Sequence, residues 1–137
     1  MLKESGLLFA AGINRLTYLR DLFRGELSRQ SQQGASSRRA FHEKHLRDGN
    51  LDPVHAPPIG YAHLTTVGEF RKLFEDRFEE IVLAGVESFT APWQEVMHDL
   101  PQDEVEPWLV LIEQTATTPE GLGFADHFLY IGRKRTV

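Results

Sequence analysis

Three short apolar runs punctuate the sequence, and amphipathic segments separate them. The runs are Gly6–Ile13 (GLLFAAGI), Glu80–Val86 (EIVLAGV) and His127–Gly132 (HFLYIG). A short, nearly unbroken apolar run is typical of a strand buried on both faces, as in a parallel sheet under helices. For the first run, a buried helix of the same length is the competing interpretation, and its leucines, phenylalanine and isoleucine favour a strand.

Helical periodicity fills most of the sequence between these runs. We expect helices over 15–27, 37–48, 90–100 and 103–115, and one that begins at Thr66. Ser36 or Ser37 is the expected N-cap of the second helix and Gly49 its stop, while Thr66 and Glu69 have the spacing of a capping box. Residues 50–64 hold three prolines and should lack regular structure.

The order of strand, helical insertion, helix, strand, helices and strand predicts one layered α/β domain over residues 1–137. A net charge of −5 argues against nucleic acid as a partner. The absence of cysteine excludes disulfides, thiolate metal sites and cysteine nucleophiles, and suits a cytoplasmic protein. No apolar run is long enough to span a membrane, and no secretion signal is evident.

Four segments, in order, resemble class I S-adenosylmethionine-dependent methyltransferases. Residues 2–8 (LKESGLL) are similar to the L-K-P-G-G-x-L turn that opens the family's fifth strand, although Glu4-Ser5 replaces Pro-Gly. Residues 60–70 resemble the start of the helix that follows, 78–87 (FEEIVLAGVE) the sixth strand, and 121–134 the closing strand with the glycines before it. The match covers nearly the whole chain.

The resemblance implies the C-terminal half of that fold. The expected architecture is a partial Rossmann-like sheet of about three mixed strands, with helices packed on it. Its last strand should be central and antiparallel, and 15–64 should form a helical and loop insertion over the acceptor substrate. The first strand should lie at one edge of the sheet, where in a whole enzyme it would pair with the fourth strand. An open apolar edge favours association, so we expect a homodimer, or a partner chain, to pair with Gly6–Ile13.

The cofactor half of the family has no counterpart in this sequence. Class I enzymes hold S-adenosylmethionine on a glycine-rich loop after their first strand, where the backbone approaches the ligand closely. The single G-x-G here, Gly121-x-Gly123, precedes the last strand and should be a turn. We therefore expect no cofactor to bind to this chain alone. The chain would be an acceptor-binding half that is inactive alone, a methyltransferase active only with a separate cofactor-binding chain, or a non-enzymatic dimeric interaction module.

The resemblance also implies where an acceptor would bind. By position after the first strand, Asn14, Arg15 and Tyr18 are candidate substrate-binding residues, with Tyr61 and His63 approaching from the proline-rich loop. A histidine beside an acceptor hydroxyl or amine has a suitable pKa for a general base. The alternative is that His63 caps or packs at the start of the next helix.

The sequence also suggests positions for four further side chains. Glu87, after the second strand, either faces a ligand or hydrogen-bonds to a nearby loop. His127 is expected to be a satisfied buried histidine, and Trp93 and Trp108 should lie on the core faces of their helices.

A metal site is the weakest candidate. His42 and His45 have the spacing of two ligands on one helix face, and His55 is nearby in sequence. An incidental pair of surface histidines is the favoured interpretation.

Overall fold

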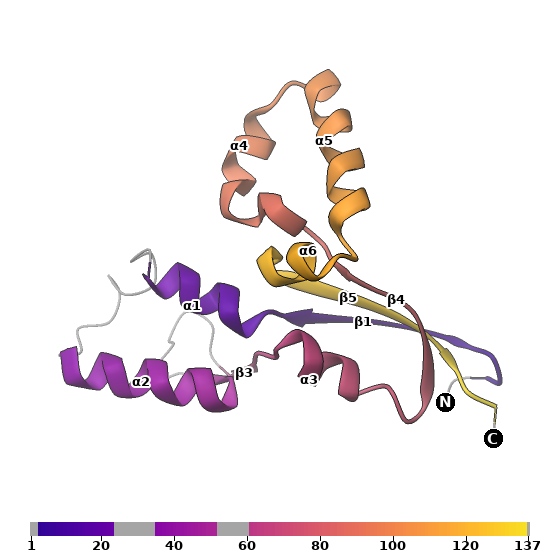
Figure 1. The fold of residues 1–137 in the computed structure, drawn as a ribbon, viewed down its shortest axis with the longest axis horizontal. Helices are drawn as coiled ribbons and strands as arrows, with labels where there is room; N and C mark the ends of the chain where they lie inside the picture. The colour runs from indigo at the N-terminus through magenta and orange to yellow at the C-terminus, as the bar shows by residue number, and fades with distance from the viewer. Residues whose placement is uncertain (1–2, 24–34, 52–60, 137) are drawn as a thin grey trace.

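The computed structural model describes residues 3–23, 35–51 and 61–136, and it has an α/β arrangement (Figure 1). In chain order the elements are β1 (Leu7–Ile13), α1 (Arg15–Phe23), α2 (Ala35–Asp48), β2 (Asn50–Leu51), β3 (Ala62–His63), α3 (Val67–Lys72), β4 (Phe78–Gly85), the 3₁₀ helix η2 (Ser88–Trp93), α4 (Gln94–Asp99), α5 (Gln102–Thr115), α6 (Pro119–Phe124) and β5 (His127–Lys134).

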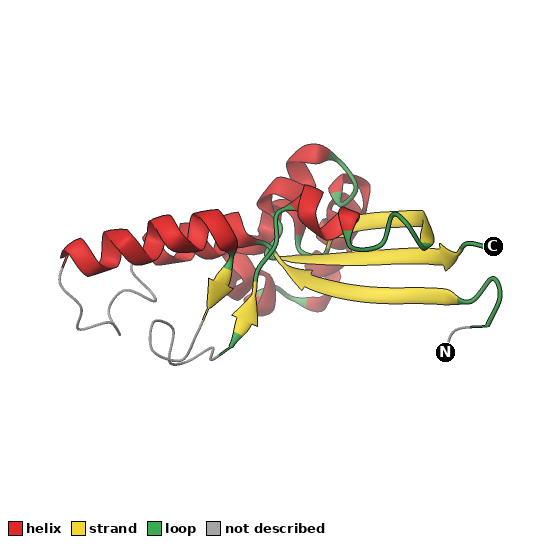
Figure 2. Cartoon of the chain, turned by 90° about the horizontal axis from the view of Figure 1, so that it is seen from below, coloured by secondary structure: helices red, strands yellow, loops and turns green. Residues whose placement is uncertain are grey.

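The main sheet has the strand order β1-β5-β4, and β5 pairs antiparallel with both neighbours. Figure 2 shows β1 and β5 side by side with their arrows opposed. The prediction of a central, antiparallel last strand is confirmed. The prediction of a mixed sheet is wrong, because β1 and β4 run in the same direction but are not neighbours, so every hydrogen-bonded pair is antiparallel.

Helices α3 and α6 cover one face of this sheet. The buried core on this face consists of Phe70, Leu83, Leu122, Phe128 and Tyr130. The capping box expected at the start of α3 is present, with the side chains of Thr66 and Glu69 each accepting from the other's backbone N–H. A Cβ on Gly12 would lie 2.6 Å from the Phe70 ring, so the glycine lets α3 approach β1 closely.

The other face of the sheet is open. Alternate side chains of β1 point to it, and Leu7, Phe9 and Ile13 are 45%, 63% and 39% exposed. Leu8 and Ala10 point to the covered face and pack on its core. The expectation that this strand is buried on both faces is therefore wrong, because no helix of the described residues packs on the side of Phe9.

A second hydrophobic cluster lies where α1 and α2 run side by side beyond the end of the sheet (Figure 1). Its buried members are Tyr18, Leu51 and Leu64. Gly49 ends α2 with a φ of +69°, as predicted. Helix α2 begins at Ala35, so the expected serine N-cap is wrong.

Two segments expected to be irregular contain regular structure. Strands β2 and β3 pair antiparallel at the two ends of the 50–64 segment, whose prolines lie outside the described residues. Residues 119–124 form α6, in which the Thr118 side chain accepts from Gly121 N and Pro119 occupies the first turn, so the expected turn is wrong. The helix expected over 90–100 is divided into η2 and α4 at Trp93.

Candidate functional site

Asn14 directly follows β1 and lies in the interior of the protein. Its side chain is 1% exposed. The side-chain amide nitrogen donates to the Ala125 carbonyl oxygen at 3.0 Å, and the amide oxygen accepts from Leu16 N at 3.1 Å. A short polar side chain that binds the first turn of a helix acts as a cap. Asn14 therefore starts α1 and fastens it to the segment before β5.

Arg15 joins the end of β1 to α3. Its guanidinium donates to the Leu64 carbonyl oxygen at 3.0 and 3.1 Å and forms an ion pair of 2.5 Å with Glu69. The backbone N–H of Thr66, followed by the charge of Arg15, lowers the pKa of Glu69. The guanidinium of Arg15 therefore binds groups of the chain itself.

Tyr18 and His45 pack edge to face at 4.8 Å between α1 and α2. Burial raises the pKa of the Tyr18 hydroxyl. His45 is fully buried, and neither ring nitrogen has a hydrogen-bond partner in the described chain. Burial, reinforced by the charge of Arg15, lowers its pKa to about 4. The interpretation of His42 and His45 as a pair of surface histidines is therefore wrong for His45.

Tyr61 and His63 lie at the surface. Tyr61 is 86% exposed, and His63 Nδ1 is 2.8 Å from the side-chain oxygen of Asn50. They line an open depression of about 520 Å³, together with Asn50, Leu51 and Ala62. His63 is positioned by β2, not by the start of α3.

The five predicted substrate-binding residues thus separate into two groups. Asn14, Arg15 and Tyr18 face the interior, and Tyr61 and His63 share a shallow surface. No described cavity is lined by both groups. Their role toward an acceptor stays a prediction.

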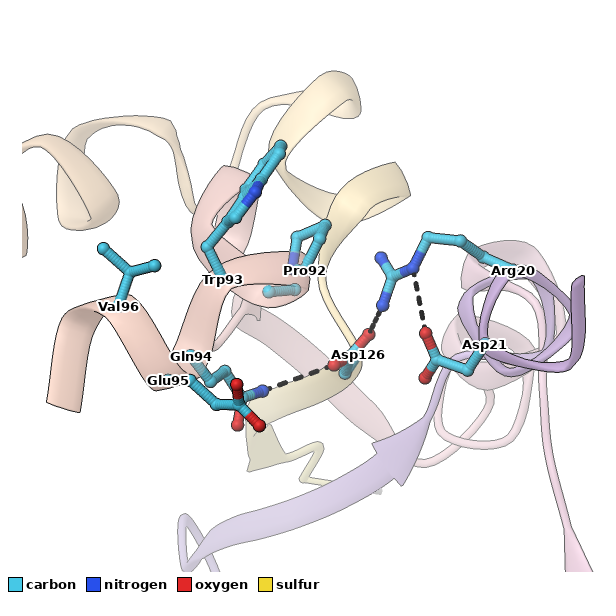
Figure 3. Close-up of a pocket in the computed structure, with 9 residues that line it drawn as sticks. Arg20, Asp21, Pro92, Trp93, Gln94, Glu95, Val96 and Asp126 are labelled. Carbon is cyan, nitrogen blue, oxygen red and sulfur yellow. Dashed lines mark hydrogen bonds and ion pairs between the residues drawn. The ribbon is translucent and has the colours of Figure 1, made fainter. Parts of the chain in front are cut away.

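A cleft of about 370 Å³ lies at the carboxyl end of β1 (Figure 3). Arg20 forms ion pairs with Asp126 at 2.6 Å and Asp21 at 3.2 Å, and Gln94 donates to the other oxygen of Asp126 at 3.3 Å. The remaining lining residues come from η2 and α4: Ala91, Pro92, Trp93, Glu95 and Val96. Three carboxylates against one guanidinium make this cleft acidic.

Glu87 and His127 form a hydrogen-bonded pair where β4 ends and β5 begins. Glu87 Oε1 lies 2.5 Å from His127 Nδ1, and Glu87 Oε2 accepts from the backbone N–H of His127 at 3.1 Å. An ionised carboxylate only accepts hydrogen bonds, so in the neutral ring this contact favours the tautomer with the proton on Nδ1 and a lone pair on Nε2. A histidine held this way is suited to act as a general base.

The His127 ring is half exposed, so the expectation of a buried histidine is wrong. In the register of β1 and β5, His127 lies opposite Ile13 and therefore belongs to the open face of the sheet. The preceding residue, Asp126, points instead into the acidic cleft. Sequence reasoning missed this pair, because its members are 40 positions apart.

The two tryptophans are also not where the sequence suggested. Trp93 is 57% exposed beside the acidic cleft, and Trp108 is 42% exposed on α5. Both were expected on the core faces of their helices. The described elements cover η2 and α5 only in part.

Comparisons with known proteins give no family assignment. No protein-family model matches the sequence, and no curated protein matches it significantly. In the described residues, no cluster of three or more acidic, histidine or cysteine side chains is placed to bind a metal ion. None of the helices in the described ranges combines the length and the apolar character needed to cross a bilayer.

Proposed function

We propose that this chain forms the acceptor-binding side of a class I methyltransferase fold and carries a general base but not the cofactor site. The observation that carries the proposal is the strand order β1-β5-β4 with a central antiparallel closing strand. The resemblance implied this arrangement for the last three strands of the family. The sequence pattern alone left the strand order open, so the agreement supports the resemblance.

The free edge of β1 is the second support. In an antiparallel pair, hydrogen-bonded positions alternate with positions whose N–H and C=O point away from the partner. Gly6 O accepts from Lys134 N, and Asn14 N donates to Asp126 O, so the even-numbered residues are the hydrogen-bonded ones. The backbone groups that point away from β5 belong to Leu7, Phe9 and Ala11.

This edge is closed only at its carboxyl end. Thr65 N donates to Ile13 O at 3.0 Å, and Arg15 N donates to Thr65 O at 2.9 Å, which makes a parallel bridge beyond the strand. Leu7 to Ala11 is therefore the length of β1 that another strand can join.

The open face favours a complementary lobe, meaning a strand with a covering helix, whichever polypeptide carries it. Pairing of β1 with β1 of a second copy would satisfy the backbone groups at the edge. It would leave the side chain of Phe9 uncovered, because strand pairing alone adds nothing above the sheet. A lobe that supplies both a strand and a helix buries both features, as neighbouring units do in layered α/β folds.

The described residues do not fit the cofactor. Gly121 and Gly123 lie in α6, and a Cβ on Gly121 would lie only 2.0 Å from the Thr115 carbonyl oxygen, so this glycine serves close packing. We therefore derive no step through the cofactor from this chain.

The chemistry of this chain is proton removal from the acceptor. His127 Nε2 accepts the proton of an acceptor O–H or N–H, while Glu87 fixes the ring and stabilises the imidazolium that results. The pair lies at one end of the open face, where β4 ends and β5 begins.

Two solution measurements test the proposal. Calorimetric titration of the chain with S-adenosylmethionine should show no binding, and tight binding by the chain alone would overturn it. Nitrogen-15 NMR should find neutral His127 protonated on Nδ1, and Glu87→Gln should shift that tautomer equilibrium. A ring already protonated on Nε2 would remove the proposed base.

A further inference from the structure

The charges of the chain are segregated along its sequence. Between Arg77 and Arg133 there is no lysine or arginine. The same stretch holds eleven acidic residues: Glu79, Glu80, Glu87, Glu95, Asp99, Asp103, Glu104, Glu106, Glu113, Glu120 and Asp126. Seven of these acids lie in α4, α5 and α6, so the three helices carry acidic side chains and no lysine or arginine, although the net charge of the chain is only −5.

Helix α5 is largely exposed although its middle is apolar. Trp108, Leu109, Val110 and Leu111 are between 42% and 53% exposed, and Ile112 is the one buried residue of the helix. Four consecutive positions span more than a full turn, so the middle of α5 is apolar on every side. A helix that is apolar all round normally lies buried. Figure 1 shows α4 and α5 standing away from the sheet.

The acidic side chains of α5 frame this apolar surface. Asp103, Glu104 and Glu106 precede it, and Glu113 follows it. All four are exposed, and none has an ion-pair partner among the described residues. An apolar centre with a rim of one charge favours a partner of the same pattern and opposite charge.

We infer that α5 docks a basic amphipathic helix of another protein. The apolar stripe of that helix would cover Leu109 and its neighbours, and its lysines or arginines would face the acidic rim. Recognition of this kind pairs the apolar face of an amphipathic helix with an apolar surface, here with the charges of the two partners complementary.

A second copy of the chain is a poorer occupant. Its own basic helix is α2, but the apolar side of α2 faces α1 through Phe41 and His45. Two of its cations are already paired, Arg39 with Glu43 and Lys44 with Asp48. Helix α2 therefore has too little apolar surface to cover α5. A membrane with anionic lipids would repel the acidic rim.

Trp108 provides the fluorescence probe, since it lies within the surface, and the second tryptophan, Trp93, lies in η2, which contacts α5. The test titrates the whole chain with a synthetic leucine–lysine peptide patterned as an amphipathic helix. The control peptide has the same composition in a scrambled order without an apolar stripe. We expect the patterned peptide to shift the emission to shorter wavelength and to bind more weakly as salt is raised.

Two variants locate the contact. Leu109→Ser with Leu111→Ser should weaken binding at least about tenfold, because two buried leucines are lost from the interface. The matched control is Leu73→Ser, which replaces a 65% exposed leucine just after α3 and should leave binding unchanged. The double variant Glu106→Gln with Glu113→Gln keeps the apolar surface and should make peptide binding less dependent on salt. Circular dichroism reports whether each variant is folded.

Three results would overturn the inference. The scrambled peptide could bind as tightly as the patterned one, the two serine replacements could leave binding unchanged, or the chain could self-associate through α5. Light scattering detects self-association, which Leu109→Ser with Leu111→Ser would then abolish. None of these results bears on β1, so the inference and the proposed function fail separately.

Discussion

Both faces of the main sheet carry large apolar side chains, but only one face is covered by helices of the described chain. On the covered face, Phe128 is fully buried beneath Phe70 of α3. On the open face, Phe9 is 63% exposed beside a free strand edge. The apolar residues of a strand therefore indicate a face suited to packing, but they do not show whether the described chain itself covers that face. The open face is the feature from which we infer a complementary lobe.

The largest expected effect compares the two phenylalanines. Phe128→Ala should lower the free energy of unfolding by about 4 kcal/mol, because it leaves a cavity in the core. Phe9→Ala should change it by less than about 1 kcal/mol, because the ring is largely solvated already. Urea denaturation of both variants checks this. A cost for Phe9→Ala close to that of Phe128→Ala would show that the open face is covered in solution.

Acid should destabilise the α1–α2 cluster through its buried histidine. The pKa of His45 is about 4 in the folded chain, against about 6.5 for an unperturbed histidine. Between pH 6.5 and 4, His45 is protonated in the unfolded chain but neutral in the folded chain. The free energy of unfolding therefore decreases as the pH falls from 6.5 to 4. Arg15, Lys44 and His42 oppose the charged form, and Asp48 favours it.

The free energy of unfolding should fall by about 2 kcal/mol over this range, because solvent screens part of the effect of a shifted histidine pKa. His45→Leu should flatten the profile in this range, as measured by thermal unfolding at several pH values. An unchanged pH dependence in that variant would place the titrating group elsewhere.

A smaller effect is expected where α3 meets β1. Gly12→Ala should cost about 1 to 3 kcal/mol, because its Cβ would overlap the Phe70 ring. The matched control is Gly68→Ala in α3, where the new Cβ meets no atom within 4 Å, so stability should be equal or slightly higher. Equal stability of the wild type and Gly12→Ala would mean that α3 does not pack tightly on the covered face.

The sequence predicted the three long strands and several helix boundaries, because these depend on local patterns. Gly49 and the pair Thr66 and Glu69 are clear examples, since capping depends on residues close in the chain. The burial of β1 was not predictable, since an apolar run has the same composition whether one face is covered or two. Similarly, periodicity in α5 suggested a core face for Trp108, but most of that face is uncovered.

The candidate site was harder to predict than the fold. The sequence suggested Asn14 and Arg15 as ligand contacts, but the chain itself occupies their polar groups. The pairing of Glu87 with His127 was hidden, because it depends on β4 and β5 lying side by side. Long-range contacts of this kind have no signature in a single sequence.

Residue-resolved amide exchange along β1 tests the central claim most directly. The N–H groups of Leu7, Phe9 and Ala11 should exchange rapidly in the isolated chain, because they point away from β5. Those of Leu8, Ala10 and Gly12 should be protected by the ladder with β5. A complementary lobe should slow the first set and leave the second unchanged. Slow exchange of Leu7, Phe9 and Ala11 in a chain shown to be monomeric would contradict the free edge and the proposed function with it.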